Sequence, residues 1–234
     1  MPLEYGDPSR MDGQLEAVAP RLGLALTASE RERLLAYMAL IQRWTKVYNL
    51  TAVRNTGEMF THHLLDCLAV VLPLRRGTGT DGQGALRVLD VGSGAGLPGV
   101  ILAMLNPGWH VTCVDAVAKK AAFIRQAAAE LGLPNLEGVH GRVEAAGTFR
   151  QPQFDLITSR AFASIQDFTT LTRPLLAPQG QWAAMKANLS VEEQGDIPAN
   201  VEMFHVEQLE VPELNEKRCL VWLRPQQPAD QAAR

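Results

Sequence analysis

The chain has 234 residues, of which 47% are hydrophobic and 20% are charged, and its formal net charge at pH 7 is −3. This composition is typical of a globular protein with enough apolar residues for a sizeable core. The small negative charge argues against a protein drawn to nucleic acid or anionic membranes by its overall field. The N-terminus lacks the basic flank and apolar core of a signal peptide, and no apolar stretch approaches the length of a membrane span. We therefore expect a cytoplasmic protein with no membrane contact.

The cysteines and histidines do not indicate a metal site. Cys67, Cys113 and Cys219 are far apart and odd in number, which favours buried free thiols in a reducing compartment. His62 and His63 are adjacent, so on a helix they point to different faces and a shared metal is not expected. A local contact between His63 and the carboxylate three residues later is the favoured interpretation, with plain packing as the alternative.

The first part of the chain carries helical signals only. Thr27 and Ser29 each precede a glutamate by three positions, which is the spacing of a capping box. Apolar residues at helical spacing follow, so we predict a long helix over about residues 30–48. Residues 49–54 break this pattern.

A second helix is predicted from Asn55, whose capping partner is Glu58, to about residue 71. Residues 74–84 are rich in Gly and Thr and predict a flexible linker. Residues 1–80 are therefore predicted to form an N-terminal helical cap with its linker.

Predicted strands and helices alternate from residue 86 onward. The strands are predicted at residues 88–91, 110–115, 135–140, 154–158, 181–186, 201–211 and 219–224, and the helices at 99–105, 117–131 and 165–176. The last two strands are separated by too few residues for a parallel crossover, so they are predicted to be antiparallel. The pattern predicts a Rossmann-like α/β domain over residues 81–226, with a doubly wound, mostly parallel seven-stranded sheet and an antiparallel C-terminal strand. Residues 227–234 are predicted to be a flexible tail.

A glycine-rich turn follows the first predicted strand. Gly92, Gly94 and Gly96 alternate with small residues, and Pro98 stands where the next helix opens, a position that suits proline. Glycine allows positive φ and lets a ligand come close to the backbone. Strand, glycine turn and helix in this order indicate a nucleotide site at the carboxyl ends of the strands.

Asp90, two residues before the first glycine, discriminates between nucleotides. A dinucleotide brings a pyrophosphate to such a turn, and a carboxylate would repel it. S-adenosylmethionine (SAM) brings an ammonium and a sulfonium instead, and its one carboxylate can meet the helix N-terminus. Leu97 also occupies the place of the third glycine in the dinucleotide pattern. The sequence therefore predicts a SAM site, and a plain tight turn in an α/β protein is the alternative.

Three further residues fit the same cofactor. Asp115 ends the second predicted strand about 20 residues after the turn, where an acid accepts hydrogen bonds from a ribose diol. A surface aspartate that caps the next helix is the alternative. Val143 and Glu144 follow the third predicted strand, where an adenine ring would lie, although a glutamate at a helix start is equally natural there.

The loop after the fourth predicted strand bears on the methyl acceptor. Residues 158–162 lack the Asn- or Asp-Pro-Pro-aromatic turn that usually serves exocyclic amines, and no cysteine nucleophile or clear metal-ligand set lies near it. A ring nitrogen such as guanine N7 has an in-plane lone pair and no proton, so it needs neither base nor metal. Its methylation requires alignment of two atoms, and positioning of this kind supplies roughly 7–11 kcal/mol of a barrier.

Arg160 lies beside the expected transfer site. A bare guanidinium about 6 Å from the purine would oppose the arriving positive charge by about 3 kcal/mol at an effective dielectric near 20. Arg160 therefore needs a partner, which is the methionine carboxylate of the cofactor, an RNA phosphate or guanine O6. A structural ion pair with Asp155 is the alternative.

Eight short blocks follow one another within residues 30–224. They are residues 49–52 (NLTA), 63–66 (HLLD), 90–99 (DVGSGAGLPG), 115 with 119–120, 141–144 (GRVE), 159–162 (SRAF), 186 (K) and 218–221 (RCLV). Together they resemble the bacterial small-subunit ribosomal RNA guanine-N7 methyltransferases (methyltransferase G), also called glucose-inhibited division protein B. This family consists of class I SAM-dependent methyltransferases.

The resemblance implies methylation of one guanine N7 in a decoding-region loop of 16S rRNA, within the small ribosomal subunit or its assembly intermediate, by a cytoplasmic enzyme that we expect to be a monomer. It places cofactor contacts on Gly92, Leu97, Val143, Glu144 and Arg160, beside Asp90, Gly94, Gly96 and Asp115 of the predicted SAM site. Arg160 positions substrate or cofactor, and the family assigns no general base.

Basic residues in or near these blocks predict a local basic rim that makes few phosphate contacts. The RNA contacts are expected at Asn49, His63, Lys119, Lys186 and Arg218. Two other functions stay open. A small-molecule methyltransferase would use the helical cap as a lid over an apolar pocket mouth, and a non-catalytic module would bind SAM or an RNA surface as a sensor.

Overall fold

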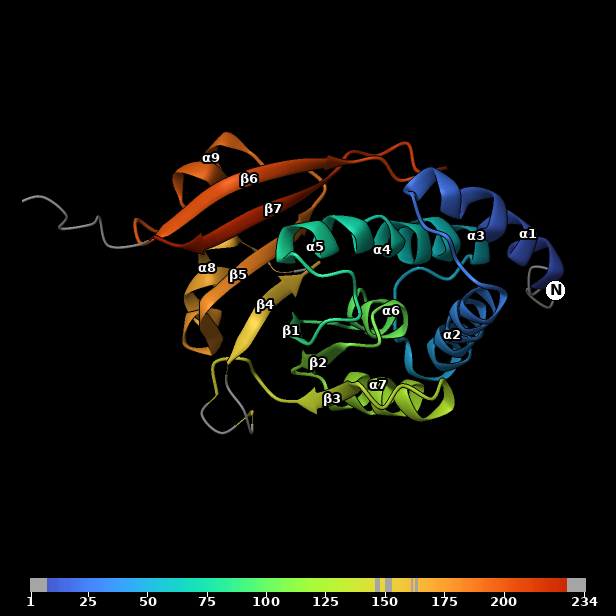
Figure 1. Ribbon diagram of the computed structural model, residues 1–234. Coiled ribbons are helices and arrows are strands. Elements are labelled where there is room, and N and C mark those ends of the chain that lie inside the picture. The colour runs from blue at the N-terminus through green and yellow to red at the C-terminus, as the bar shows by residue number, and fades with distance from the viewer. Residues whose placement is uncertain (1–7, 146–147, 150–152, 161, 163, 227–234) are drawn as a thin grey trace, which may run out of the picture.

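The computed structural model describes residues 8–145, 148–149, 153–160, 162 and 164–226. A seven-stranded sheet with the strand order β3-β2-β1-β4-β5-β7-β6 forms its centre (Figure 1). The strands are β1 (Leu86–Val91), β2 (Trp109–Asp115), β3 (Leu136–His140), β4 (Phe154–Ser159), β5 (Leu176–Lys186), β6 (Val201–Leu209) and β7 (Arg218–Pro225). The first five pair in parallel, and β7 pairs antiparallel with both β5 and β6. The predicted Rossmann-like sheet with a reversed C-terminal strand is confirmed, while the predicted tail at 227–234 lies outside the described residues.

Helices cover both faces of this sheet. They are α1 (Pro8–Val18), η1 (Ala19–Leu22), α2 (Ala28–Tyr48), α3 (Thr56–Met59), η2 (Phe60–Leu65), α4 (Asp66–Leu68), α5 (Val71–Thr78), α6 (Gly99–Leu105), α7 (Ala118–Glu130), α8 (Ile165–Thr172), η3 (Arg173–Leu175) and α9 (Val191–Gly195). In Figure 1 the N-terminal helices gather on the same side of the sheet as α6 and α7, and α8 and α9 lie on the other side. The N-terminal helices therefore stand over the half of the sheet that carries the glycine turn.

Local signals explain where the N-terminal helices begin and end. The Thr27 hydroxyl accepts a hydrogen bond from the Glu30 N–H while the Glu30 carboxylate accepts one from the Thr27 N–H, so the predicted capping box is present. Asn49, with φ of 50°, ends α2 in the left-handed conformation. The Asn55 side chain accepts from the N–H groups of residues 57 and 58, as predicted. The helix predicted after Asn55 is present as an unbroken helical run over residues 56–68, in which the π-helical segment η2 lies between α3 and α4.

The predicted flexible linker is wrong. Residues 71–78 form α5, and the segment after it is held by hydrogen bonds to the loop before β2. Arg75 Nε donates to Asn106 Oδ1 at 2.7 Å, Trp109 Nε1 donates to Thr80 Oγ1 at 3.0 Å, and the Gly108 N–H donates to the Gly82 carbonyl at 3.0 Å. The Gly- and Thr-rich composition suggested freedom, but these partners are 25 or more residues away and are brought in only by the fold.

Strand β5 begins earlier than predicted. It starts at Leu176, where the predicted helix at residues 165–176 was expected to end, and it contains Pro178 and Gly180 ahead of the predicted start at residue 181. Leu176 pairs with Phe154 whereas Gln181 pairs with the residue two positions further on, so the intervening residues form an irregular stretch. A proline is tolerated there because no regular ladder hydrogen bond requires its missing N–H.

Alternation along the strands divides the core into two layers. Val88 faces one layer, which it shares with α2, α6, α7 and the other N-terminal helices, and Leu89 faces the layer beneath α8. Tyr37 of α2 is fully buried in the first layer, and its hydroxyl donates a hydrogen bond to the Ala95 carbonyl of the glycine turn. The helical cap and the sheet thus share one core, which fixes the cap directly against the turn.

Candidate functional site

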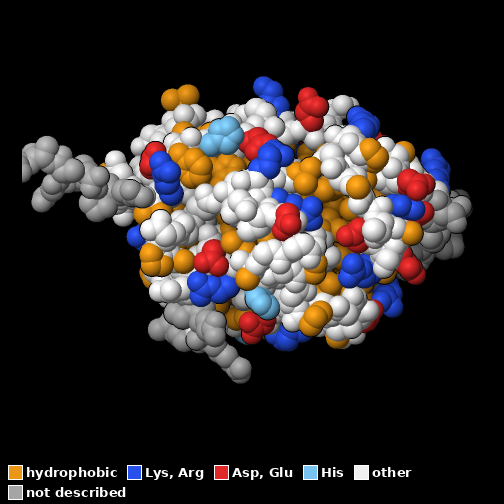
Figure 2. Space-filling model, in the orientation of Figure 1, with side chains coloured by type: hydrophobic (Ala, Val, Ile, Leu, Met, Phe, Trp, Pro, Cys, Tyr) orange, Lys and Arg blue, Asp and Glu red, His pale blue; other side chains and the backbone are white. Residues whose placement is uncertain are grey.

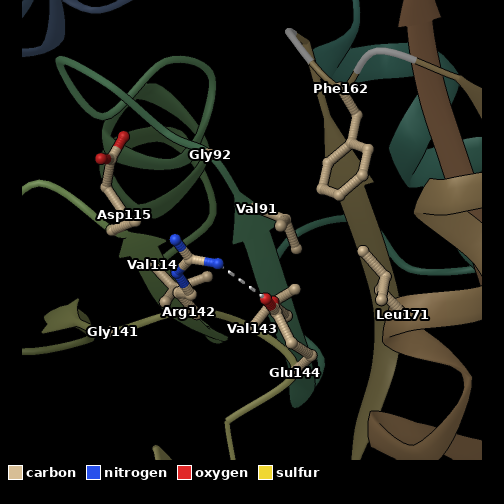
Figure 3. Close-up of a pocket in the computed structure, with 11 residues that line it drawn as sticks. Val91, Gly92, Val114, Asp115, Gly141, Arg142, Val143, Glu144, Phe162 and Leu171 are labelled. Carbon is tan, nitrogen blue, oxygen red and sulfur yellow. Dashed lines mark ion pairs between the residues drawn. The ribbon is translucent and has the colours of Figure 1, made fainter.

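A pocket of about 350 Å³ opens where the glycine turn meets the carboxyl ends of β1 and β2 and the loop after β3 (Figure 3). Asp115 and Arg142 lie on one wall in this view, and the side chains of Phe162 and Leu171 form the opposite wall. Ligands of open α/β sheets bind at this edge. The pocket therefore lies at the carboxyl ends of the strands, where the sequence predicted a nucleotide site.

The glycine turn has the backbone that its composition predicts. Gly92, Gly94 and Gly96 have φ values of 66°, 59° and 82°, a region that other residues adopt only with strain. The Gly92 N–H donates to the Val114 carbonyl at 2.9 Å, which fastens the turn to β2. A β-carbon at Gly92 or Gly94 would meet no other atom within 4 Å, so the turn leaves open space that a bound ligand can use.

Asp115, for which the sequence predicts a ribose contact, lines the pocket. Its carboxylate accepts hydrogen bonds from the Gly94 N–H at 3.0 Å and the Val117 N–H at 2.9 Å, and Lys120 Nζ lies 3.6 Å away. The alternative of a surface aspartate that caps α7 is not what the structure shows, because Asp115 is buried and its backbone partner Val117 precedes the helix, and Asp115 lines the pocket. A carboxylate offers about four acceptor positions, so capacity remains for a ribose diol.

The predicted adenine-side residues also line the pocket. Val143 is buried, and the Glu144 carboxylate lies 3.8 Å from Arg142 Nη1. Phe162 and Leu171 complete an apolar wall that the sequence analysis did not assign to the cofactor. Phe162 belongs to the block at residues 159–162, and this block is the only feature of the sequence that pointed to Phe162.

Five predicted cofactor residues are absent from the lining of this pocket, namely Asp90, Gly94, Gly96, Leu97 and Arg160. Leu97 and Asp90 lie behind the turn. Leu97 is packed in the core, and its N–H donates to the Ser93 carbonyl at 3.0 Å. The Asp90 carboxylate is 0% exposed, and its Oδ2 accepts the Gly99 N–H at 3.0 Å. Among the described residues Asp90 Oδ1 has no hydrogen-bond partner. Burial raises the pKa of Asp90 to about 7, although the Gly99 N–H and the charge of Arg160 act in the opposite direction.

Arg160 has a different partner from the alternative that the sequence suggested. Its Nη1 donates to the His62 carbonyl at 2.8 Å and lies 3.5 Å from Asp66 Oδ2. Asp155 instead binds Arg87, with 3.2 Å between Asp155 Oδ1 and Arg87 Nη2, so the predicted pairing with Arg160 is wrong. The two residues are five positions apart along an extended strand, which separates them by about 16 Å.

A second pocket, of about 230 Å³, lies between η2 and the ends of β5 and β7. Arg160, Lys186 and Arg218 line it together with Asp66, so three of the predicted functional residues meet here. Arg218 Nε donates to Asp66 Oδ1 at 3.0 Å, and Lys186 Nζ contacts the Glu193 carboxylate.

The other predicted RNA residues lie elsewhere. His63 is buried, its Nε2 lies 2.9 Å from Thr51 Oγ1, and its predicted contact with Asp66 is wrong because two arginines occupy that carboxylate. Burial, followed by the charge of Arg160, lowers the pKa of His63 to about 4. Asn49 accepts a hydrogen bond from Arg54, and Lys119 Nζ donates to the backbone carbonyl before Asn49, both at 2.8 Å.

In the part of the chain that the structure describes, no three His, Cys, Asp or Glu side chains form a metal-ligand set. None of the described helices is both long and apolar enough to cross a bilayer. Cys67, Cys113 and Cys219 are buried and unpaired with one another.

Charge is distributed unevenly along the chain. Residues 187–216, which include α9 and β6, contain eight acidic residues and no lysine or arginine, so the rest of the chain has an excess of basic residues. Side chains of both signs are interspersed over the face seen in Figure 2, without a broad basic surface in that view. The basic residues that line the second pocket are therefore a local feature.

The family model "GidB: rRNA small subunit methyltransferase G" matches residues 30–221. Curated relatives named ribosomal RNA small subunit methyltransferase G include one from Methylibium petroleiphilum, 54% identical over 209 residues, which are 89% of this chain and 92% of the relative. Another, from Polaromonas sp., is 57% identical over 212 residues, or 90% of this chain and 92% of the relative.

Solved structures with low sequence identity share the fold. TrmN from Thermus thermophilus has a TM-score of 0.55 at 17% identity and covers 94% of this chain and 79% of its own. A SAM dependent methyltransferase from Aquifex aeolicus has a TM-score of 0.50 at 17% identity, covering 65% of this chain and 87% of its own. The chain belongs to the GidB family, rRNA small subunit methyltransferase G.

Proposed function

We propose that this protein transfers the methyl group of SAM to the N7 atom of one guanine in a decoding-region loop of 16S rRNA. The observation that carries the proposal is the adjacency of two pockets. Phe162 lines the pocket at the glycine turn, and Arg160, two residues earlier, lines the pocket that also contains Lys186 and Arg218. A cofactor pocket beside a pocket with basic walls suits methyl transfer to RNA, and the family of the chain supports ribosomal RNA as the substrate.

The residues of the first pocket fit SAM, which supplies an activated methyl group on a sulfonium. Asp115 would accept hydrogen bonds from the ribose hydroxyls, and Val143 with Glu144 would border the adenine. The turn from Gly92 to Gly96 would lie along the methionine end, with Leu97 supporting it from the core. In this proposal the unpartnered Oδ1 of Asp90 serves the ammonium group.

Arg160 is the proposed positioning residue between the two sites. Its charge acts on the pKa of Asp90 behind the glycine turn, and its guanidinium also lines the second pocket. Its ion pair with Asp66 offsets part of the charge of Arg160, which reduces the electrostatic difficulty of a cation near the transfer site. The methionine carboxylate and an RNA phosphate remain the proposed ligands of Arg160, which lines the second pocket.

No general base takes part in the proposed reaction. Guanine N7 attacks the methyl carbon with its own lone pair in line with the departing sulfur, and no proton leaves N7. The work of the protein is alignment, which supplies roughly 7–11 kcal/mol of a barrier. The burial of His63 and its contact with Thr51 support a structural part for this histidine and not proton transfer.

The RNA is proposed to be presented by the small ribosomal subunit or its assembly intermediate, in the cytoplasm, to a monomer of this protein. A base displaced from a folded particle suits a protein with local basic pockets, since RNA recognition favours unstacked bases over helical grooves. Lys186 and Arg218 are the proposed contacts within the second pocket. Asn49 follows the last residue of α2, and Lys119 of α7 donates a hydrogen bond to that last residue.

The test is incubation of the protein with labelled SAM and small ribosomal subunits that lack the modification, followed by mapping of the labelled base. We expect label on one guanine in the decoding region, at N7. Methylation of a metabolite in the absence of ribosomal particles would instead favour the small-molecule methyltransferase. Binding of SAM without transfer to any such particle would favour the sensor module.

A further inference from the structure

Asp66 joins two arginines that come from distant parts of the chain. It is the first residue of α4, and its side chain is 5% exposed. Its Oδ2 lies 3.5 Å from Nη1 of Arg160, which follows β4, and its Oδ1 accepts from Nε of Arg218, which begins β7, at 3.0 Å. Both carboxylate oxygens are thus engaged inside the protein, so the two guanidinium groups are held at fixed places along one wall of the second pocket.

The polar side chains of this pocket are mainly donors. Arg160, Lys186 and Arg218 carry only N–H groups, and the one carboxylate in the wall, Asp66, is occupied by the arginine pair. The Watson–Crick edge of guanine presents two N–H donors beside one acceptor, O6, so a wall of donors can pair with O6 but leaves both N–H groups without acceptors. A phosphodiester presents only acceptor oxygens and one negative charge, and arginine forks match it well.

We propose that this pocket binds one phosphate of the RNA backbone next to the target nucleotide, with Asp66 as the residue that positions the arginine pair. The inference rests on the proposed function and assigns a subsite within it. A volume of about 230 Å³ is enough for a group of phosphate and sugar size. The neighbouring nucleotide would then lie toward Phe162 and the cofactor pocket, two residues along the chain from Arg160.

A second carboxylate occupies this region in the structure. Glu216, in the segment between β6 and β7, lies 2.9 Å from Arg218 Nη2 and 3.4 Å from His62 Nε2. Its side chain is 55% exposed, in contrast to the buried Asp66. Exposed ion pairs are worth about 0–1 kcal/mol, so an incoming phosphate can replace this carboxylate at little cost. Lys186 has a similar internal counter-charge in Glu193, although that pair is more buried.

This arrangement predicts opposite effects for substitutions a few residues apart. Arg218→Ala removes a phosphate ligand and should raise KM for unmethylated small subunits about tenfold, because one charge-assisted hydrogen bond is lost. It should also reduce the slope of log binding constant against log salt by about 1. Glu216→Gln removes a competitor and should lower that KM by about threefold. KM for SAM should change in neither variant.

A matched pair of substitutions controls for general charge effects. Arg224 and Glu202 form a similar surface ion pair on β7 and β6, with 2.8 Å between Arg224 Nε and Glu202 Oε2, and neither lines the pocket. Arg224→Ala and Glu202→Gln alter the net charge by the same amounts and should leave KM for small subunits and the salt slope unchanged.

Asp66→Asn tests the positioning role. With the carboxylate charge removed, the two arginines lose their common anchor, and KM for small subunits should rise while KM for SAM stays the same. Because Asp66 is buried this variant can fail to fold, and Arg218→Ala also removes a partner of Asp66, whereas Glu216→Gln changes a side chain that is 55% exposed and carries the test by itself.

The two proposals fail in different ways. If the unaltered protein methylates no RNA in small subunits, the proposed function is wrong. If it does so, but Arg218→Ala and Glu216→Gln keep its KM and salt slope, the phosphate subsite is wrong and the proposed function stands. A decrease in KM for Glu202→Gln as large as that for Glu216→Gln would also overturn the subsite, since it would reveal a general charge effect.

Discussion

The side chain of Asp90 accepts a hydrogen bond from the backbone N–H of Gly99 at 3.0 Å, and this bond joins the end of β1 to the first turn of α6. The glycine turn connects these two elements, so the hydrogen bond holds the two ends of the turn together. Cys113 Sγ lies 3.9 Å from the same carboxylate oxygen. Asp90, which the sequence assigned to the charge of the cofactor, is therefore also part of the structure that holds the turn.

Asp90→Asn should stabilise the protein at neutral and higher pH. Burial raises the pKa of Asp90 to about 7, well above the ordinary value of an aspartate, so the unfolded chain ionises it at lower pH than the folded protein does. The folded state consequently loses stability as pH rises from about 4 to 7, on the order of 2–4 kcal/mol. Asparagine keeps an acceptor for Gly99 and does not ionise. Urea unfolding should show a gain for the variant at pH 8 and almost none at pH 4, and an equal difference at both would contradict this account.

Two glycines should respond differently to alanine. A β-carbon at Gly99 would lie 2.2 Å from Cys113 Sγ and 2.9 Å from Asp90 Oδ2, so Gly99→Ala should cost about 1–3 kcal/mol of unfolding free energy through overpacking. At Gly92 the added carbon has open space, but the φ of 66° costs about 1–2 kcal/mol and the methyl group faces the pocket. In calorimetric titration, Gly92→Ala should therefore lose more affinity for SAM than Gly99→Ala does, for a similar loss of unfolding free energy.

Tyr37→Phe tests the link between the helical cap and the glycine turn. The Tyr37 hydroxyl is buried and donates to the Ala95 carbonyl, and its removal leaves that carbonyl without its partner. We expect a loss of about 1–3 kcal/mol in unfolding free energy and weaker SAM binding. Tyr48→Phe is the control, because Tyr48 is exposed at the end of the same helix. Similar losses in the two variants would show that the buried hydroxyl has no special part.

His63 should make the protein less stable in acid. Burial and the charge of Arg160 lower its pKa to about 4, while the unfolded chain protonates it near 6.5. The stabilising contribution is thus complete above pH 6.5 and is lost as the pH falls from 6.5 to 4, on the order of 2–3 kcal/mol. His63→Gln should flatten this part of the stability profile, and His62→Gln, at a partly exposed position, should not. Asp90 acts in the opposite direction over the same interval, so each variant must be compared with the unaltered protein at every pH.

The ion pair of Arg160 should matter for both folding and turnover. Arg160→Ala leaves the buried Asp66 with one arginine fewer, and loss of a partner from a buried pair costs about 3–5 kcal/mol. Arg160→Lys keeps the charge without the fork, and we expect it to fold better while binding SAM more weakly than the unaltered protein. Normal SAM affinity and normal turnover in Arg160→Ala would show that the assignment of this residue is wrong.

Asp155→Asn is the control for Arg160, because it removes the carboxylate that the sequence offered as an alternative partner. Asp155 and Arg87 form a partly exposed pair, whose loss should cost no more than about 1 kcal/mol. Its effect on SAM binding should be negligible, and a large loss of turnover would reopen the role of Asp155.

The strands and most helices could be predicted because their signals are local. Capping at Thr27 and Asn55, apolar periodicity and the run of glycines before Pro98 each depend on residues within one or two turns of chain. The predictions failed where distant partners override composition. Residues 74–84 look flexible but are tied to the loop before β2, and β5 extends through Pro178 because β4 shifts its register there.

The sequence by itself determined the fold class, the glycine turn and its positive φ values, and the placement of Asp115, Val143 and Glu144 at the predicted cofactor pocket. Only the tertiary structure decided the partners of the charged side chains. Asp66 binds Arg160 and Arg218 because the cap packs against the ends of β4 and β7, which lie 94 and 152 positions further along the chain. The local sequence pattern determines the conformation of a segment. An ion pair instead depends on which distant segments come into contact when the two layers of the core pack.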